Sequence, residues 1–137
     1  MSSYTAIIGL LGGIVGASLQ YLFARRTEAY KQLQATKVLA YVDFVKAVAN
    51  RAAAQKRHQQ EKEFDAISLL TDAKVRIAVY GSKEVVSSVG DFFRQHGSLN
   101  TPEAIEAFAK VIQTMRLQTV KSNDKLTSEE ISNLLFW

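Results

Sequence analysis

Residues 4–24, YTAIIGLLGGIVGASLQYLFA, carry no charged side chain and are followed at once by Arg25 and Arg26. At a rise of ~1.5 Å per residue, this stretch of about 21 residues would extend ~30 Å as an α-helix, which is the thickness of a bilayer's hydrocarbon core. The sequence therefore predicts a transmembrane helix, within an N-terminal anchor at residues 1–26. Residues 27–137 are predicted to form one helical domain.

Four glycines lie inside the predicted span, and they form two overlapping ladders of small residues. Gly9 and Gly13 are four residues apart, as are Gly12 and Gly16, and Ala17 extends the first pair by a further turn. Missing side chains at this spacing let a second helix approach closely in lipid. The pattern predicts packing of membrane helices and a homo-oligomer, while the alternative that glycine is simply common in membrane helices stays open.

The charges beside the span predict its orientation. The residues before it carry only the terminal amine, whereas Arg25, Arg26, Lys31 and Lys37 follow it. Basic flanks stay on the cytoplasmic side, so a single-pass protein with its N-terminus outside and its domain in the cytosol is expected. Arg25, Arg26 and Lys31 are expected to contact lipid headgroups. A cleaved signal peptide is the alternative, but the basic start and the Ala-x-Ala pattern of such peptides are missing.

Composition fits one anchored domain. The 113 residues that follow the span are enough for one modest core. The chain has no cysteine, so it has no disulfide framework and no thiolate site, as is usual in a reducing compartment. The net charge of +4 lies outside the span and favours the bilayer's anionic lipids as neighbours, but it is too small to indicate nucleic acid.

Residues 27–60 contain neither glycine nor proline, which predicts that the membrane helix continues into the cytosol as one rod. Apolar side chains at helical spacing are expected to turn one face of this rod toward a core: Tyr30, Leu33, Tyr41, Phe44, Val45, Val48 and Ala52. The polar run QKRHQQEKE at residues 55–63 marks the first turn, where His58 is expected to be a surface residue.

A second helix is predicted at residues 63–80, with its core face formed by Ala66, Ile67, Leu70, Ala73, Ile77 and Tyr80. Val75 and Val79 lie on the opposite side, so this helix is predicted to be central and covered from two directions. Asp65 and Asp72, seven residues apart, are interpreted as solvated charges.

Gly81 is expected to take the left-handed position after the second helix, and Ser82 to cap a third helix at residues 83–96. The apolar content of this helix is Val85, Val86, Val89, Phe92 and Phe93. Its first turns do not offer the exposed base-reading side chains of a DNA recognition helix, so the corner is interpreted as part of a plain bundle.

Thr101 and Pro102 open a fourth helix as N-cap and first helical residue, and its predicted core stripe is Ile105, Phe108, Ala109, Ile112, Met115 and Thr119. A capping box at residues 127–130 begins a short last helix. Its apolar end, Leu134, Leu135, Phe136 and Trp137, is predicted to dock on its own bundle, with a neighbouring subunit or the membrane surface as alternatives. The predicted fold is all-α: an antiparallel bundle of about four helices plus a short C-terminal helix.

Patterns typical of enzymes are missing from the sequence. There is no thiol nucleophile, no Ser-His-carboxylate pattern, no Gly-rich phosphate loop outside the predicted span, and no HExxH or paired-carboxylate metal motif. We therefore expect no catalysis, no cofactor and no metal. A cytosolic enzyme with a membrane anchor stays open as an alternative.

Three segments carry a family resemblance: QYLFARRTEAYKQLQATKVLAYVDFVKAVA at residues 20–49, TDAKVRIAVYGSKEVV at 71–86 and ISNLLF at 131–136. Together they resemble a group of short, membrane-anchored helical proteins of bacteria that carry no assigned activity. The resemblance implies an inner-membrane location with the domain in the cytosol, and it implies no catalytic residues.

The leading hypothesis is a membrane-anchored, self-associating adaptor whose cytosolic bundle binds a partner protein or its own copies. The alternative is an effector that perturbs the membrane, as a defence or toxin component does, through assembly of its glycine-ladder helices.

Overall fold

The computed structural model describes the backbone of residues 2–120 and 125–136, and the side chains of residues 17–120 and 125–136. This part of the chain forms five helices and no strand: α1 (Ser2–Lys56), α2 (Gln60–Tyr80), α3 (Lys83–Gln95), α4 (Pro102–Thr119) and α5 (Ser128–Phe136). The prediction of an all-α fold is confirmed. The chain divides into two compact units, Met1–Ala35 and Thr36–Trp137, and α1 contributes to both.

The described side chains of the first unit are mostly exposed. Leu19, Tyr21 and Phe23 are more than half exposed. Tyr30 and Leu33 were predicted to face a core, but they are 56% and 44% exposed, so the prediction is wrong for these two residues. Within α1 the first buried side chain among the described residues is Ala40, which belongs to the second unit.

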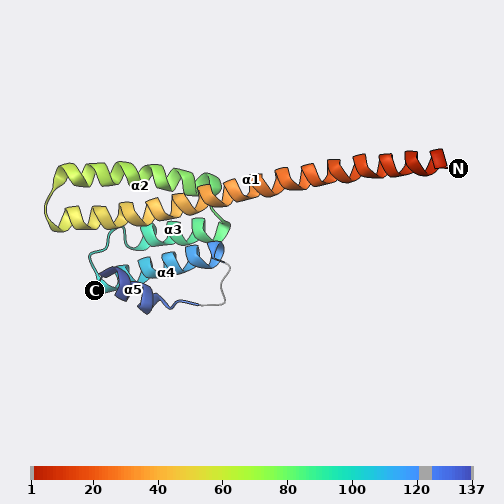
Figure 1. Ribbon diagram of the computed structural model, residues 1–137. Helices are drawn as coiled ribbons and strands as arrows, with labels where there is room; N and C mark the ends of the chain where they lie inside the picture. The colour runs from red at the N-terminus through yellow and green to blue at the C-terminus, as the bar shows by residue number, and fades with distance from the viewer. Residues whose placement is uncertain (1, 121–124, 137) are drawn as a thin grey trace. The chain divides into compact units, whose positions relative to one another are not determined.

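In the second unit, residues 36–56 of α1 lie between α2 on one side and α3 and α4 on the other (Figure 1). The core joins buried side chains from all four helices: Tyr41, Phe44 and Val48; Leu70, Ala73 and Ile77; Val85, Val89 and Phe92; and Phe108, Val111 and Met115. The ring of Phe44 lies 5.9 Å from that of Phe93 and 6.4 Å from that of Phe108. The central helix of the domain is therefore α1.

The prediction that α2 is central and covered on both sides is wrong. Its buried residues, Ala66, Leu70, Ala73 and Ile77, form one stripe. On the other side, Val75 is 57% exposed and Val79 is also exposed. Ile67 and Tyr80, at the edges of the predicted core face, are exposed as well. One buried stripe is what a helix at the edge of a bundle needs, because only one neighbouring layer covers it.

Gly81 is required for a different reason from the one predicted. Its φ of −70° is not left-handed, so the expected left-handed position is wrong. A Cβ on Gly81 would instead lie 2.5 Å from the carbonyl oxygen of Ile77, which accepts the Gly81 N–H at 2.7 Å. The corner between α2 and α3 is thus too tight for any side chain at this position.

The predicted caps that start the later helices are confirmed. Ser82 Oγ accepts a hydrogen bond from the Val85 N–H at 3.3 Å, and Thr101 Oγ1 accepts one from the Ala104 N–H at 3.1 Å. Before α5, Thr127 Oγ1 accepts from the Glu130 N–H at 3.2 Å, and Glu130 Oε1 accepts from the Thr127 N–H at 3.3 Å. This reciprocal pair is a capping box, and it fixes the start of α5.

The short helix α5 docks on its own domain, as predicted. Ile131 is buried, and the ring of Phe136 lies 6.4 Å from that of Phe108. The prediction is wrong for Leu134 and Leu135, which are 80% and 43% exposed and do not join the core. Trp137, which belongs to the same prediction, lies outside the described residues.

Candidate functional site

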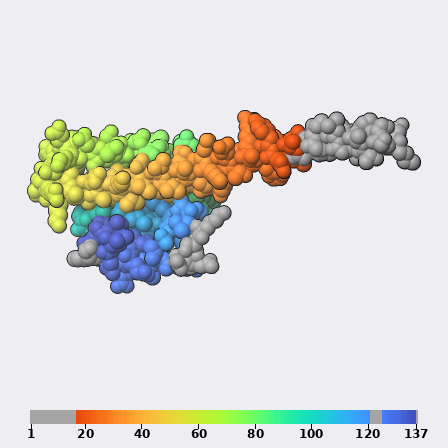
Figure 2. Space-filling model, in the orientation of Figure 1, coloured from red at the N-terminus to blue at the C-terminus, as the bar shows by residue number. Residues whose placement is uncertain are grey.

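An open apolar groove of about 370 Å³ lies on the second unit between α1, α4 and α5, and we call it the α1–α4–α5 groove. Its walls are formed mainly by aliphatic side chains: Val38, Tyr41, Val42, Val45 and Lys46 of α1; Ile112, Met115, Arg116 and Thr119 of α4; Val120 and Leu126; and Ile131, Leu134 and Leu135 of α5. On the face shown in Figure 2, the orange-to-yellow surface of α1 meets the blue surface of α4 and α5.

The α1 wall of the groove results from an apolar stripe that is wider than the core needs. Tyr41, Phe44 and Val48 occupy the core. Val38, Val42 and Val45 continue the apolar surface at a spacing of four and three residues, which places them on a neighbouring strip of the same helix. The sequence prediction included Val45 but not Val38 or Val42. The width of the stripe was the signal that could have identified them.

The opposite wall depends on how α5 is held. Ile131 and Phe136 pack inward, and the Gln113 side chain of α4 donates a hydrogen bond to the Leu126 carbonyl at 2.8 Å. These contacts hold both ends of residues 126–136 against the domain. Leu134 and Leu135 therefore stay on its outside. Val42 is 44% exposed, and Leu134 is the most exposed large apolar residue among those described. A contiguous apolar surface of this kind is typical of an interaction site.

The charged residues in the groove wall are both cations. Lys46 is exposed and Arg116 is half-buried, and neither forms an ion pair with a carboxylate in the described part of the chain. Asp43 is engaged elsewhere: its Oδ2 accepts a hydrogen bond from Arg76 Nη2 of α2 at 2.7 Å. This hydrogen bond is the main cause that raises the pKa of Arg76 above its ordinary value. The groove therefore combines an apolar floor with positive charge.

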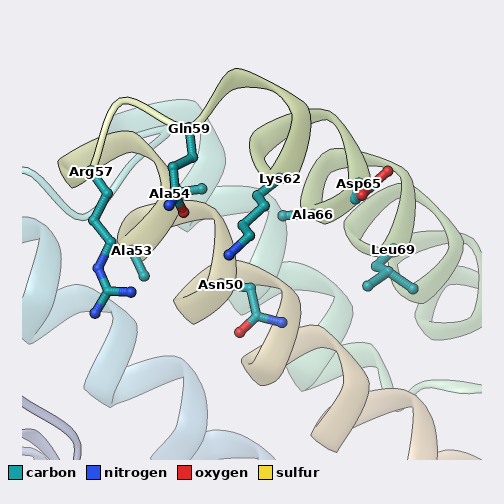
Figure 3. Close-up of a pocket in the computed structure, with 9 residues that line it drawn as sticks. All are labelled: Asn50, Ala53, Ala54, Arg57, Gln59, Lys62, Asp65, Ala66 and Leu69. Atoms are coloured by element: carbon teal, nitrogen blue, oxygen red, sulfur yellow. The ribbon is translucent and has the colours of Figure 1, made fainter.

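A second hollow, of about 270 Å³, lies at the turn between α1 and α2. Figure 3 shows the Lys62 side chain reaching from α2 toward Asn50 of α1, with Arg57 and Asp65 on either side. Arg57, Lys62 and Asp65 are all exposed, so water solvates their charges. His58, in the same turn, is an exposed residue with a φ of 55°, as expected for a surface turn. The arrangement is that of a solvated helical corner.

Asp72 was interpreted as a solvated charge, and the structure adds a neighbour to it. Its Oδ2 accepts a hydrogen bond from Arg76 Nε at 3.1 Å, but the side chain remains 65% exposed. An exposed pair of this kind contributes little to stability. Among the residues that the structure describes, no group of three or more His, Asp or Glu side chains is placed to hold a metal ion.

The predicted membrane residues fall into two sets. Gly9, Gly12, Gly13 and Gly16 are in α1, but they lie outside the residues whose side chains are described. Ala17, Arg25, Arg26 and Lys31 are exposed. Their roles in helix packing and headgroup contact stay predictions.

From residue 17 onward, the described helices include none that is long and apolar enough to cross a membrane. Most of the predicted span, residues 4–16, lies before that point. The transmembrane helix at residues 4–24 therefore also stays a prediction.

No family model matches the chain, and no curated protein or solved structure is significantly similar to it. The resemblance to short, membrane-anchored helical proteins of bacteria rests on the sequence segments alone.

Proposed function

We propose that this protein is a membrane-anchored adaptor without catalytic activity, whose helical domain binds a partner protein through the α1–α4–α5 groove. The anchor is the uncharged stretch at residues 4–24 with Arg25 and Arg26 behind it. The observation that carries the proposal is the groove, because Val38, Val42 and Leu135 in its walls remain exposed although the domain has a core of its own.

The domain is proposed to lie in the cytosol of a bacterium, with the span crossing the inner membrane once. Because basic residues flank only the C-terminal end of the span, we expect a reporter enzyme that is active only in the periplasm to stay silent when fused after Trp137. The same reporter fused to the N-terminus through a short linker serves as the matched positive control. Activity of the C-terminal fusion would reverse the proposed orientation.

Self-association is proposed to use the glycine ladders. Replacing Gly12 and Gly13 together by isoleucine would place branched side chains on both ladders and keep the helices apart. We expect a marked loss of signal in a membrane two-hybrid assay. The control is the double variant Leu10→Ile and Leu11→Ile, which has isoleucine at two neighbouring positions, keeps all four glycines and should keep the signal. An unchanged signal would place any oligomer contact in the helical domain instead.

Partner binding at the groove can be tested by photo-cross-linking in living cells. A benzophenone amino acid at Val42, inside the groove, should cross-link to another protein in the membrane fraction. The same group at Val75, which is more exposed but lies on the outer face of α2, is the matched control. We expect the cross-link at Val42 to be stronger by about tenfold and to disappear in the Leu135→Asp background. Equal or absent cross-links at the two positions would contradict an adaptor role for the groove.

A second candidate function is an effector that perturbs the membrane, which the two glycine ladders favour, because closely packed helices are what an assembly in the bilayer requires. Leakage of a small dye from cells on overexpression distinguishes the two functions. The adaptor should cause none, whereas the effector should cause leakage that the Gly12→Ile and Gly13→Ile changes abolish.

A further inference from the structure

We propose that the occupant of the α1–α4–α5 groove is an amphipathic helix of another protein that carries acidic residues beside its apolar face. This inference rests on the proposed adaptor function and names the chemistry of its partner.

The shape of the groove favours a helix over a small molecule. Small-molecule sites enclose most of the ligand surface. Here the walls are open: Val42 and Leu135 are each more than 40% exposed, and Leu134 is 80% exposed. A helix needs only one buried side, and a trough between helices accepts its apolar residues at positions i, i+3, i+4 and i+7.

The charge of the groove favours an acidic partner. Lys46 and Arg116 line it, and no described carboxylate pairs with either of them. The one acidic residue of α1 within the second unit, Asp43, pairs with Arg76 and with neither of these two cations. Glutamate or aspartate side chains flanking an apolar helix face would complement both cations, and like charges would be rejected.

The same observations argue against two other occupants, which are a second copy of this chain and a membrane surface. A second copy of this chain has a net charge of +4, so it is on average a poor match for a cationic groove. A membrane surface is flat on this scale, so it would reach the protruding Leu134 but not the apolar side chains deeper in the groove, such as Met115. The acidic helix satisfies both the concave shape and the positive charge.

The test uses the full chain in nanodiscs of zwitterionic phosphatidylcholine, so that the lipid adds no net charge. The probes are two fluorescent helical peptides of about 15 residues, with leucine at i, i+3, i+4 and i+7. One carries glutamate on both flanks of the leucines, and the other carries lysine at the same places. Fluorescence anisotropy gives the two affinities.

We expect the glutamate peptide to bind at least about tenfold more tightly than the lysine peptide. The double variant Lys46→Glu and Arg116→Glu should invert that order. Val42→Asp should weaken both peptides, whereas Val75→Asp, on the outer face of α2, should change neither. Circular dichroism of each variant checks that the helices remain. Equal affinities, no binding, or an order that the double variant leaves unchanged would each overturn the proposal.

A lipid occupant is examined with the benzophenone group at Val42 in nanodiscs that contain phosphatidylglycerol. A lipid adduct in the mass spectrum would assign the groove to lipid and overturn the acidic-helix proposal. The cellular cross-link at Val42 separates the two proposals. A protein cross-link without any preference for the glutamate peptide would refute the acidic helix and leave the adaptor function intact. If the glutamate peptide is preferred but the benzophenone group at Val42 gives no protein cross-link in cells, the adaptor function is refuted instead.

Discussion

Phe108→Ala is expected to lower the free energy of unfolding of the helical domain by about 3 to 5 kcal/mol, the usual cost of removing a fully buried aromatic ring. Phe108 is 0% exposed, and its ring lies 5.7 Å from that of Phe92, 6.4 Å from that of Phe44 and 6.4 Å from that of Phe136. It therefore joins four helices at one point. A loss of this size is a large share of the ~5 to 15 kcal/mol of a typical domain.

Urea denaturation of a fragment that begins at Glu28, followed by far-UV circular dichroism, measures this loss. Leu134→Ala is the matched control, since Leu134 is a large apolar residue at 80% exposure, and its replacement should change the unfolding free energy by no more than ~0.5 kcal/mol. A cost below about 1 kcal/mol for Phe108→Ala would mean that the four helices do not meet at this ring.

Gly81→Ala and Gly90→Ala are the same chemical change with opposite expected signs. The new methyl group at position 81 would lie 2.5 Å from the Ile77 carbonyl oxygen, a backbone atom that cannot turn away. The corner between α2 and α3 must open, and we expect a loss of about 1 to 3 kcal/mol, as for other overpacked sites. At Gly90, inside α3, a methyl group meets nothing within 4 Å, and the better helix propensity of alanine should add about 0.5 to 1 kcal/mol.

Thermal melting of the two variants and of the unchanged fragment shows whether each change raises or lowers the melting temperature. If both changes lowered the melting temperature to the same degree, the close approach at Gly81 would not be the reason for its glycine.

Three helix starts could be predicted from the sequence because their chemistry is local, whereas α2 begins at Gln60 instead of residue 63, where no side chain caps it. Ser82, Thr101 and the Thr127–Glu130 pair each cap a helix with an atom that lies within three residues. The core face of α3 could be predicted for a similar reason: Val85, Val89 and Phe92 repeat at the spacing of one helical face, and all are buried. On α4, Phe108 and Met115 are buried as predicted, but the predicted stripe missed the buried Val111.

What the sequence could not provide is which apolar faces receive a cover. Tyr30 and Val75 are apolar at helical spacing like the core residues, but both are exposed. Burial depends on which helix lies alongside, and helix periodicity carries no information on that. The groove has the same origin, because Val38 and Val42 belong to an apolar strip of α1 that remains exposed. The sequence alone shows only that Val38 and Val42 belong to a wide apolar stripe.

The central place of α1 in the domain also has a consequence for synthesis. Contacts between α2 and α3, between α3 and α4, and between α4 and α5 join neighbours in the sequence, and such local contacts form quickly. Phe44 of α1, however, is covered in part by Phe108 of α4, which leaves the ribosome much later. A nascent chain that stops between α3 and α4 keeps part of that apolar face uncovered. We expect cells to degrade such truncated chains rapidly, and to spare those that extend past α4.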